Sequence, residues 1–291
     1  MMVKEFNTWS EQIEKLKDHG CGEFSSIENA EKILQRVNYY RLTAYFLPFR
    51  DDVTQKYDSS KVSFDKIYNI YTFNTKIRHL LLEYLEEIEL YFKTQIAYCH
   101  SRDYGPLAYN YADNFNNFHK HDNFLRKLDE ELEYHKKTLV YKHHVEKYEN
   151  EFPLWVMIEF FTFGMVSRFY SDMPSKIQQE ISKNLNLKPA QTRTYMEVVT
   201  VLRNYCAHFN RLYYSTFSVV PNELPAFMNE NIKIKNRLLP QIYALKSLYF
   251  DNKKWNDNFL PRLTDLIETY SNDIHLHHIG FTDNWSQILR K

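Results

Sequence analysis

The sequence predicts an all-α protein, and three observations support this. Apolar residues recur every three or four positions over long stretches, as on the buried side of an amphipathic helix. Glycine occurs only 5 times in 291 residues, so the Asn-Gly and Asp-Gly turns typical of β-hairpins are missing. Aromatic residues make up 16% of the chain, and we expect many of them to pack between helices.

The longest apolar stripe runs from about Phe64 to His100 and predicts one long helix, which Tyr104-Gly105-Pro106 should end. A very apolar helix is expected from Leu154 to Tyr170, and another from Ala190 to Leu212. Shorter helices are expected near 27–37, 122–135, 175–185, 235–250 and 259–271. Because no repeat or flexible linker is evident, we expect one α-helical unit over residues 1–291.

Composition excludes several classes of protein. Lys+Arg 37 and Asp+Glu 37 give a net charge of +0, so a broad basic surface for nucleic acid is absent, although a local basic site stays open. The five glycines are too scattered for a phosphate-binding loop. An odd cysteine count without Cys-x-x-Cys spacing argues against a disulfide scaffold or a thiolate zinc site. With no signal segment and no bilayer-spanning run, we expect a cytoplasmic protein that does not enter a membrane.

One segment places an arginine, an amide and a histidine within two turns of an apolar helix: Arg203-Asn204-Tyr205-Cys206-Ala207-His208. On a continuous helix Asn204, His208 and Arg211 share one polar face, with Arg203 beside it. An imidazole suits proton transfer near neutral pH, and a guanidinium donates to two phosphate oxygens. These residues fit RNA cleavage without a metal, with Arg203, His208 and Asn204 as catalytic candidates and Arg211 on a neighbouring phosphate.

The same motif residues have a simpler explanation. A half-buried histidine bonded to a carbonyl, beside an arginine paired with a glutamate, occurs in many helices that have no catalytic role.

Acidic residues offer further candidates. Glu159 lies inside an apolar stretch, so we expect it to be buried and paired, with a structural or supporting role. Arg78 is expected to have a similar role, because it or Lys93 is placed to neutralise Glu89. The cluster of Glu83, Glu86, Glu87 and Glu89 fits a solvated helix face better than a metal site.

A basic stretch follows the helix at 122–135. It contains Lys136, Lys137, Lys142, His143 and His144 together with Tyr134 and Tyr141, which fits either RNA binding or a polar surface loop. A second histidine group, His275, His277 and His278, fits a surface cluster better than a zinc site. No metal site and no cofactor are therefore expected.

Several segments resemble the Abi (abortive infection) family of the HEPN superfamily, in the family's own order. The arginine–histidine motif followed by Arg211-Leu212 matches its hallmark, and Asn74 stands where an aspartate is common. Tyr213-Tyr214 replace a frequent Asn-Arg, which removes one arginine of the phosphate clamp. The other matching segments are 38–49, 71–78, 88–89, 104–106, 153–159, 163–167 and 280–285.

The resemblance implies an HEPN-like helical bundle at about 62–215, with additional N-terminal helices and a helical extension at 216–291. It implies a phage-defence or toxin–antitoxin role and an endoribonuclease that leaves 2′,3′-cyclic phosphate and 5′-hydroxyl ends. Its active site would be shared by a homodimer, with Arg203 and His208 from both copies. Expected partners are RNA, a second copy and a restraining antitoxin protein or small RNA. Two alternatives stay open: a non-catalytic RNA- or protein-binding module, and a metal-dependent hydrolase.

Overall fold

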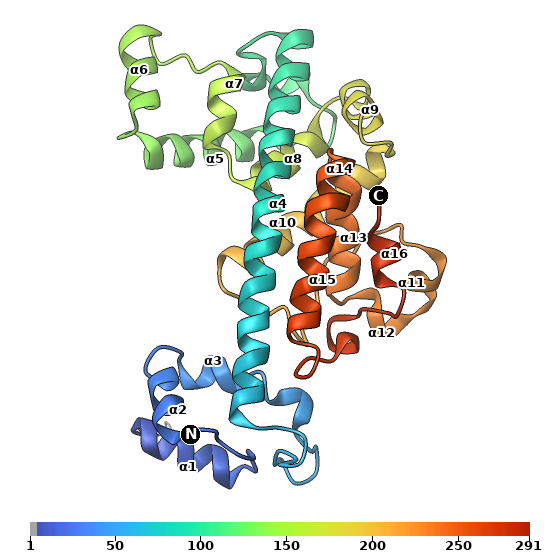
Figure 1. Ribbon diagram of the computed structural model, residues 1–291. Coiled ribbons are helices and arrows are strands. Elements are labelled where there is room, and N and C mark those ends of the chain that lie inside the picture. Colours follow the sequence, from blue (N-terminus) through green and yellow to red (C-terminus); the bar gives the residue numbers. More distant parts are fainter. Residues whose placement is uncertain (1–4) are drawn as a thin grey trace.

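The computed structural model describes residues 5–291, and helices are the regular secondary structure throughout this range (Figure 1). The prediction of an all-α protein is confirmed. The β-type pairing recorded in these residues is a single bridge between Arg50 and Tyr57.

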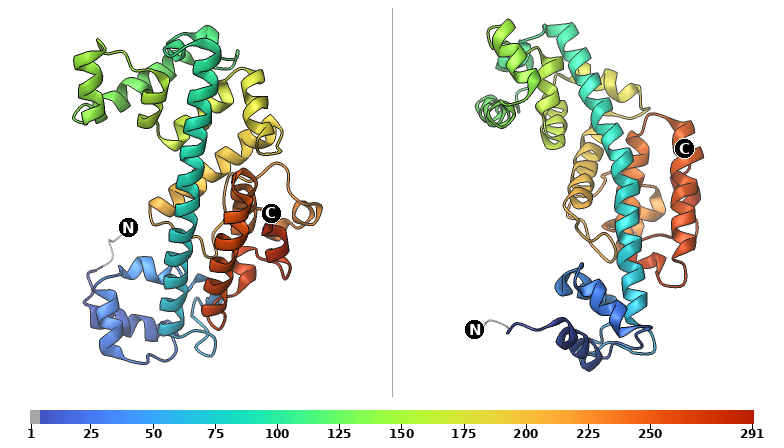
Figure 2. Two further views of the ribbon diagram at one scale, coloured as in Figure 1. Left: turned by 45° about the horizontal axis from the view of Figure 1, so that its top comes forward. Right: turned by 60° about the vertical axis from the view of Figure 1, so that its left-hand side comes forward.

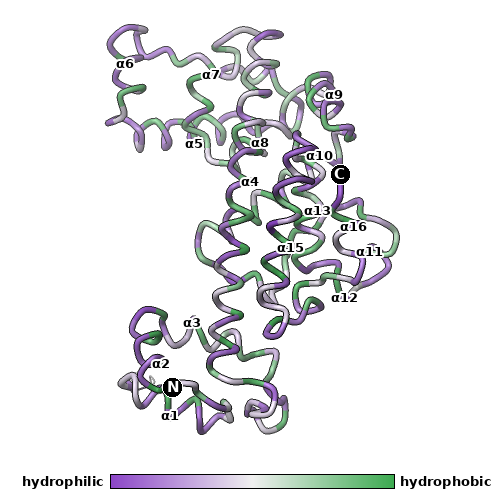
Figure 3. Tube along the Cα trace, viewed as in Figure 1, coloured by the Kyte–Doolittle hydropathy of each residue, from purple (hydrophilic) through white to green (hydrophobic). Residues whose placement is uncertain are grey.

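One long helix, α4 (Phe64–Tyr104), runs through the whole molecule and organises the rest (Figure 1). Its 41 residues begin where the Ser63 hydroxyl accepts from Lys66 N, and they end at Gly105, whose φ of +100° favours glycine. Hydrophobic and hydrophilic residues alternate along it (Figure 3). The expected long helix is confirmed and extends four residues beyond His100.

The other helices pack on two sides of α4 (Figures 1 and 2). The helices α13 (Leu238–Leu248) and α15 (Leu260–Thr269) lie on one side. The C-terminal end of α10 (Pro189–Ala207) lies on the other side, between the N-terminal helices and an arm. The N-terminal helices are α1 (Trp9–Asp18), α2 (Ile27–Leu34) and α3 (Tyr39–Thr43), and the arm consists of α5 (His121–His135) and α6 (Leu139–Lys147).

Shorter helices complete the fold. They are α7 (Leu154–Met157), α8 (Phe163–Asp172), α9 (Ser175–Lys183), α11 (Ala226–Glu230), α12 (Ile232–Lys235), α14 (Asn252–Lys254) and α16 (Trp285–Leu289).

Aromatic side chains join the C-terminal helices to α4, as the composition predicts. Tyr84 of α4 is fully buried, and its ring centroid lies 4.8 Å from that of Phe259 and 5.1 Å from that of Tyr249. Trp255 stacks on Phe259 at 4.0 Å and donates its indole N–H to Leu289 O at 2.7 Å. The polar atoms of these buried rings thus have hydrogen-bond partners, as is usual for buried Tyr and Trp side chains.

The apolar stretch predicted as one helix from Leu154 to Tyr170 is broken. After α7, a 3-10 turn spans Ile158–Phe160, and α8 begins only at Phe163. Thr162 causes the restart, because its hydroxyl accepts from Met165 N at 3.3 Å and caps the new helix. Glu159 lies in the turn and is exposed, so the expectation that it would be a buried carboxylate is wrong.

His100 of α4 gives a test of the core. It is fully buried against the rings of Tyr104, Phe115 and Phe169, and this burial lowers its pKa from 6.5 to about 4. Between these values the unfolded chain binds a proton that the folded chain does not, so the free energy of unfolding falls as the pH falls. When the pH falls from 7.5 to 4.5, we expect protonation of His100 in the unfolded chain to lower the free energy of unfolding by about 2–3 kcal/mol.

Urea unfolding of wild type and His100→Leu at both pH values measures this cost. The variant should lose less stability than the wild type on acidification, and equal losses would contradict the assignment.

Candidate functional site

The helix that carries the motif ends earlier than the sequence predicts. It stops at Ala207, His208 caps it, and Phe209 adopts a left-handed backbone with φ +57°. Asn210 N then donates to Tyr205 O at 2.8 Å, and Phe209 N donates to Cys206 O at 3.4 Å. This pair of bonds is a Schellman motif. The expected continuation to Leu212 is therefore wrong, because Phe209 occupies the position at which glycine usually signals a helix end.

The left-handed Phe209 is held from outside. A bulky residue in this conformation costs about 1–2 kcal/mol. Arg41 donates to Phe209 O at 2.6 Å, and the Arg78 guanidinium lies 5.4 Å from the centre of the Phe209 ring. The ring itself is 60% exposed. Strained residues that neighbours hold in place cluster at functional sites, so this turn marks the end of α10 as a candidate.

Two side chains of α4, Asn74 and Arg78, fix the turn to the core, and together we call them the α4 latch. Buried Arg78 donates to Cys206 O at 3.1 Å, which gives this carbonyl at the helix end a second and shorter donor contact than that from Phe209 N. Buried Asn74 accepts from Leu212 N at 2.8 Å and from Tyr213 N at 3.0 Å through one side-chain oxygen. An aspartate at this position would offer the same acceptor. Arg78 thus positions the motif.

The motif residues are open to solvent. Asn204 and His208 are both exposed and lie one helical turn apart, with His208 N donating to Asn204 O at 3.0 Å. The imidazole of His208 has no hydrogen-bond or ion-pair partner within residues 5–291. Arg203 is 34% exposed and lies 3.7 Å from a Glu89 carboxylate oxygen, while one terminal nitrogen lies 3.4 Å from Asn204 Oδ1.

The simpler explanation of the motif is a histidine bonded to a carbonyl beside an arginine paired with a glutamate. Only the second of these two contacts is found within residues 5–291. Arg203 pairs with a glutamate, whereas His208 is not bonded to a carbonyl.

Arg211 lies away from this group. Because α10 has already ended, the predicted shared face of Asn204, His208 and Arg211 is wrong. The Arg211 guanidinium donates to Ala44 O and lies 5.9 Å from the centre of the Tyr45 ring. Burial lowers its pKa. Arg211 therefore joins the motif turn to the segment that follows α3.

A line of charges leads away from Arg203. Glu89 lies 3.6 Å from Lys93 Nζ as well as near Arg203, and Lys93 donates to the backbone carbonyl of Glu159 at 3.2 Å. Arg78 and Lys93 are the two residues predicted to neutralise Glu89, and Lys93 is the one that lies beside it. Within residues 5–291 no ion pair joins the side chain of Glu159 to an arginine of α10.

The basic stretch is divided among several roles. Lys136 pairs with Glu133. His144 bonds Val140 O at 2.9 Å and stacks on Phe152, so it packs α6 in place. The remaining members, Lys137, Lys142 and His143, are exposed. They lie on the α5–α6 arm, on the same side of α4 as the end of α10 (Figures 1 and 2).

The acidic cluster on α4 does not converge on one point. Glu83 pairs with Arg262 at 2.8 Å, and Glu87 pairs with Lys254 at 2.6 Å. In the histidine group, His278 is buried and its Nδ1 lies 2.7 Å from the Tyr213 hydroxyl. Over residues 5–291, no three His, Cys, Asp or Glu side chains are placed together as metal ligands.

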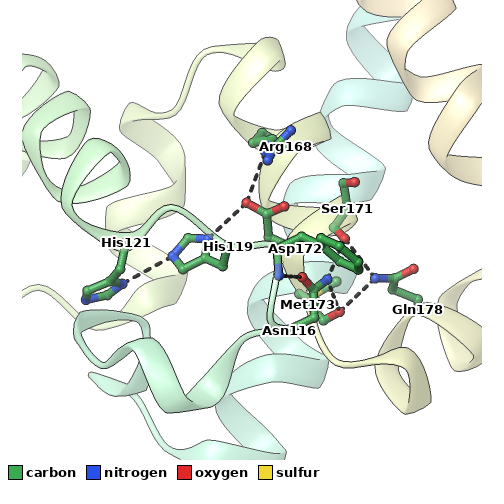
Figure 4. Close-up of polar contacts among 9 residues, drawn as sticks. Asn116, His119, His121, Arg168, Ser171, Asp172, Met173 and Gln178 are labelled. Atoms are coloured by element: carbon green, nitrogen blue, oxygen red, sulfur yellow. Dashed lines mark hydrogen bonds and ion pairs between the residues drawn. The ribbon is translucent and has the colours of Figure 1, made fainter.

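A second polar cluster was missed by the sequence analysis (Figure 4). Asp172, at the end of α8, lies 2.9 Å from His119 Nδ1 and 3.0 Å from Arg168 Nε. His119 Nε2 lies 3.1 Å from His121 Nδ1. Asn116 and Gln178 donate to carbonyls of the same turn. The pair His119 and His121 is visible in the sequence, but its carboxylate partner is 53 residues away.

Fold and site together define an all-helical protein with an exposed Arg-(four residues)-His motif at the end of a helix packed on a long central helix. The family model described as Abi-like protein matches residues 32–214. The chain therefore belongs to the Abi-like protein family, which indicates a role in abortive infection, a form of phage defence.

No curated protein and no solved structure is significantly similar to the chain. In the part of the chain that the structure describes, no helix has the length and apolar character needed to cross a bilayer.

The α4 latch gives a test of how the motif is positioned. In Asn74→Ala the buried N–H groups of Leu212 and Tyr213 lose their acceptor, so we expect the free energy of unfolding to fall by about 2–4 kcal/mol. Asn74→Asp keeps an acceptor at the same place and should retain most of the stability. Urea unfolding of the three proteins measures both effects, and a loss below about 0.5 kcal/mol in Asn74→Ala would contradict the role of the latch.

Proposed function

We propose that this protein is a metal-independent endoribonuclease of the HEPN type that acts in phage defence. The observation that carries the proposal is the exposed, unpartnered His208 at the end of α10, one turn from Asn204 and in the same motif as the half-exposed Arg203. An imidazole with both nitrogens available is what proton transfer needs.

The charge around the motif supports an RNA substrate. Arg41 and Arg78 donate to main-chain oxygens of the motif turn, and Arg211 donates to Ala44 O. None of the three is paired with a carboxylate within residues 5–291, and Glu89 is shared between Arg203 and Lys93. The turn is therefore locally positive although the whole chain has a net charge of +0, and positive charge attracts phosphate.

The chemistry follows from these groups. A base takes the proton of a ribose 2′-hydroxyl, and the 2′-oxygen attacks the adjacent phosphorus. The bond to the 5′-oxygen breaks, and an acid gives that oxygen a proton, which leaves a 2′,3′-cyclic phosphate and a 5′-hydroxyl. His208 transfers protons, and Arg203 stabilises the charge that grows on the phosphate oxygens. Asn204 orients the phosphate or the imidazole.

One histidine is too few for separate acid and base roles, and a second copy supplies another. A face suited to a second copy adjoins the Arg203 network. Tyr98 and Trp155 are 66% and 54% exposed, and they line a cavity of about 530 Å³ that Lys93 also lines. Exposed aromatic residues around a cavity are typical of protein interfaces. We infer that a homodimer covers this face and brings two motifs to one groove.

Two further features belong to the proposal. Lys137, Lys142 and His143 extend the RNA surface along the arm, because they are exposed and the arm lies on the same side of α4 as the end of α10. A toxin of this kind needs restraint before infection, which an antitoxin protein or a small RNA would supply.

The alternative is a non-catalytic RNA- or protein-binding module in the same defence role. The contact of Arg203 with Glu89 favours it, because an arginine already engaged by a carboxylate is less available to a phosphate.

RNA cleavage in the presence of EDTA tests the proposal. Wild-type protein should degrade total RNA and leave DNA intact. Arg203→Ala and His208→Ala should each reduce the rate by about 10²–10⁴-fold, the usual contribution of a group that transfers protons or stabilises charge. The matched control is His79→Ala, because His79 is an exposed histidine of α4 that faces α15 rather than the motif.

Binding of RNA without cleavage would support the non-catalytic alternative. Activity that survives both motif substitutions would assign the cleavage to another site.

The dimer has its own test. Trp155→Glu and Tyr98→Glu place charges in the proposed interface and should convert a dimer to a monomer in light scattering after gel filtration. Tyr134→Glu is the matched control, because Tyr134 is 81% exposed on the arm and outside this face. A wild-type protein that is monomeric at micromolar concentration would contradict the shared site.

A further inference from the structure

Two members of the polar cluster, Asp172 and His119, line a separate cavity of about 300 Å³. This volume is at the lower end of the range that small ligands occupy. The cavity opens between α5 and α8, and Arg203 and His208 do not line it. It is therefore a site distinct from the motif and goes beyond the proposed function.

Hydrogen-bond contacts hold the cluster together. Asp172 Oδ2 lies 2.9 Å from His119 Nδ1, and His119 Nε2 lies 3.1 Å from His121 Nδ1. His121 Nε2 lies 2.9 Å from the carbonyl oxygen of Asn110. The Asp172 carboxylate is therefore already engaged by His119 and by Arg168.

Three cations line the cavity, Arg168, Lys120 and Lys127, against one carboxylate, that of Asp172. Arg168 is anchored through Nε to Asp172, and its two terminal nitrogens form no hydrogen bond or ion pair within residues 5–291. Lys120 and Lys127 line the cavity from the arm and form no ion pair within the same residues. Asp172 is the single acidic residue among the described residues of the lining. The lining therefore carries more cationic than acidic side chains and includes a fork-shaped donor, which suits an anion.

The cavity also has an apolar and aromatic lining. Phe124 and Phe169 line it together with Met165, which suits a flat ring. Gly164 also lines the cavity, and a β-carbon added there would make ordinary van der Waals contacts, with its nearest neighbours at 3.9 Å. We propose that this cavity binds a nucleoside monophosphate group, with the phosphate at Arg168, Lys120 and Lys127 and the base against the phenylalanine rings.

Calorimetric titration of the full chain with adenosine monophosphate tests this assignment. We expect saturable binding, with adenosine at least about tenfold weaker because it lacks the charged acceptor. Lys120→Ala and Lys127→Ala should each weaken binding about threefold or more. Gly164→Met should abolish it by filling the cavity. Lys253→Ala is the matched control, because Lys253 is exposed and does not line the cavity.

A second experiment identifies where the bound nucleotide group comes from. A 5′-phosphorylated tetraribonucleotide, made resistant to cleavage by 2′-O-methylation, is compared with the same oligomer bearing a 5′-hydroxyl. Preference for the phosphorylated oligomer over the free nucleotide supports an RNA end as the occupant, and the reverse order supports a free nucleotide. Equal binding of adenosine and its monophosphate would overturn the proposal, as would binding unchanged in Gly164→Met. Thermal unfolding confirms that each variant is folded, and loss of RNA cleavage alone leaves these binding results unaffected.

Discussion

The position of the motif depends on one constraint, the attachment of the carbonyl end of α10 to the side of α4. A helix end leaves its last carbonyls without partners in the helix, and Arg78 of α4 donates to that of Cys206 from inside the core. Asn74, one turn earlier on α4, holds the chain that leaves the turn. Because α4 is a single helix of 41 residues, every element packed on it is placed relative to His208 by the same rigid axis.

The N-terminal helices are part of this site rather than an addition to it. Arg41, at the end of α3, donates to Phe209 O, and Arg211 of the motif turn donates back to Ala44 O. The exchange places two arginine side chains across one junction without a carboxylate between them. Such an arrangement costs electrostatic repulsion and desolvation, which an anion bound nearby would relieve. Residues far apart in sequence thus build a single positive surface in a chain with a net charge of +0.

The sequence predicts those parts of the fold that follow from periodicity. The long helix, the start of α5 and the positions of α9, α13 and α15 all come from apolar stripes and caps. Prediction from the sequence fails where contacts between residues far apart in the chain decide the local backbone structure. Phe209 ends α10 in a conformation that its own chemistry disfavours, so Arg41 and Arg78 decide the stop. Thr162 begins a helix inside an apolar run, and Glu159 becomes exposed as a result. The cluster at Asp172 was missed because its partners meet only in the folded chain.

The two sites share a structural connection through α8. Its Gly164 lines the cavity, and a β-carbon there would come within 3.9 Å of the Thr200 methyl group. Thr200 precedes Arg203 on α10 by three residues, which is about one helical turn. Gly164 therefore lies next to both the cavity and the motif helix. A group bound against Arg168 and Phe169 would contact α8, the helix that packs on α10 and so on the element that carries Arg203.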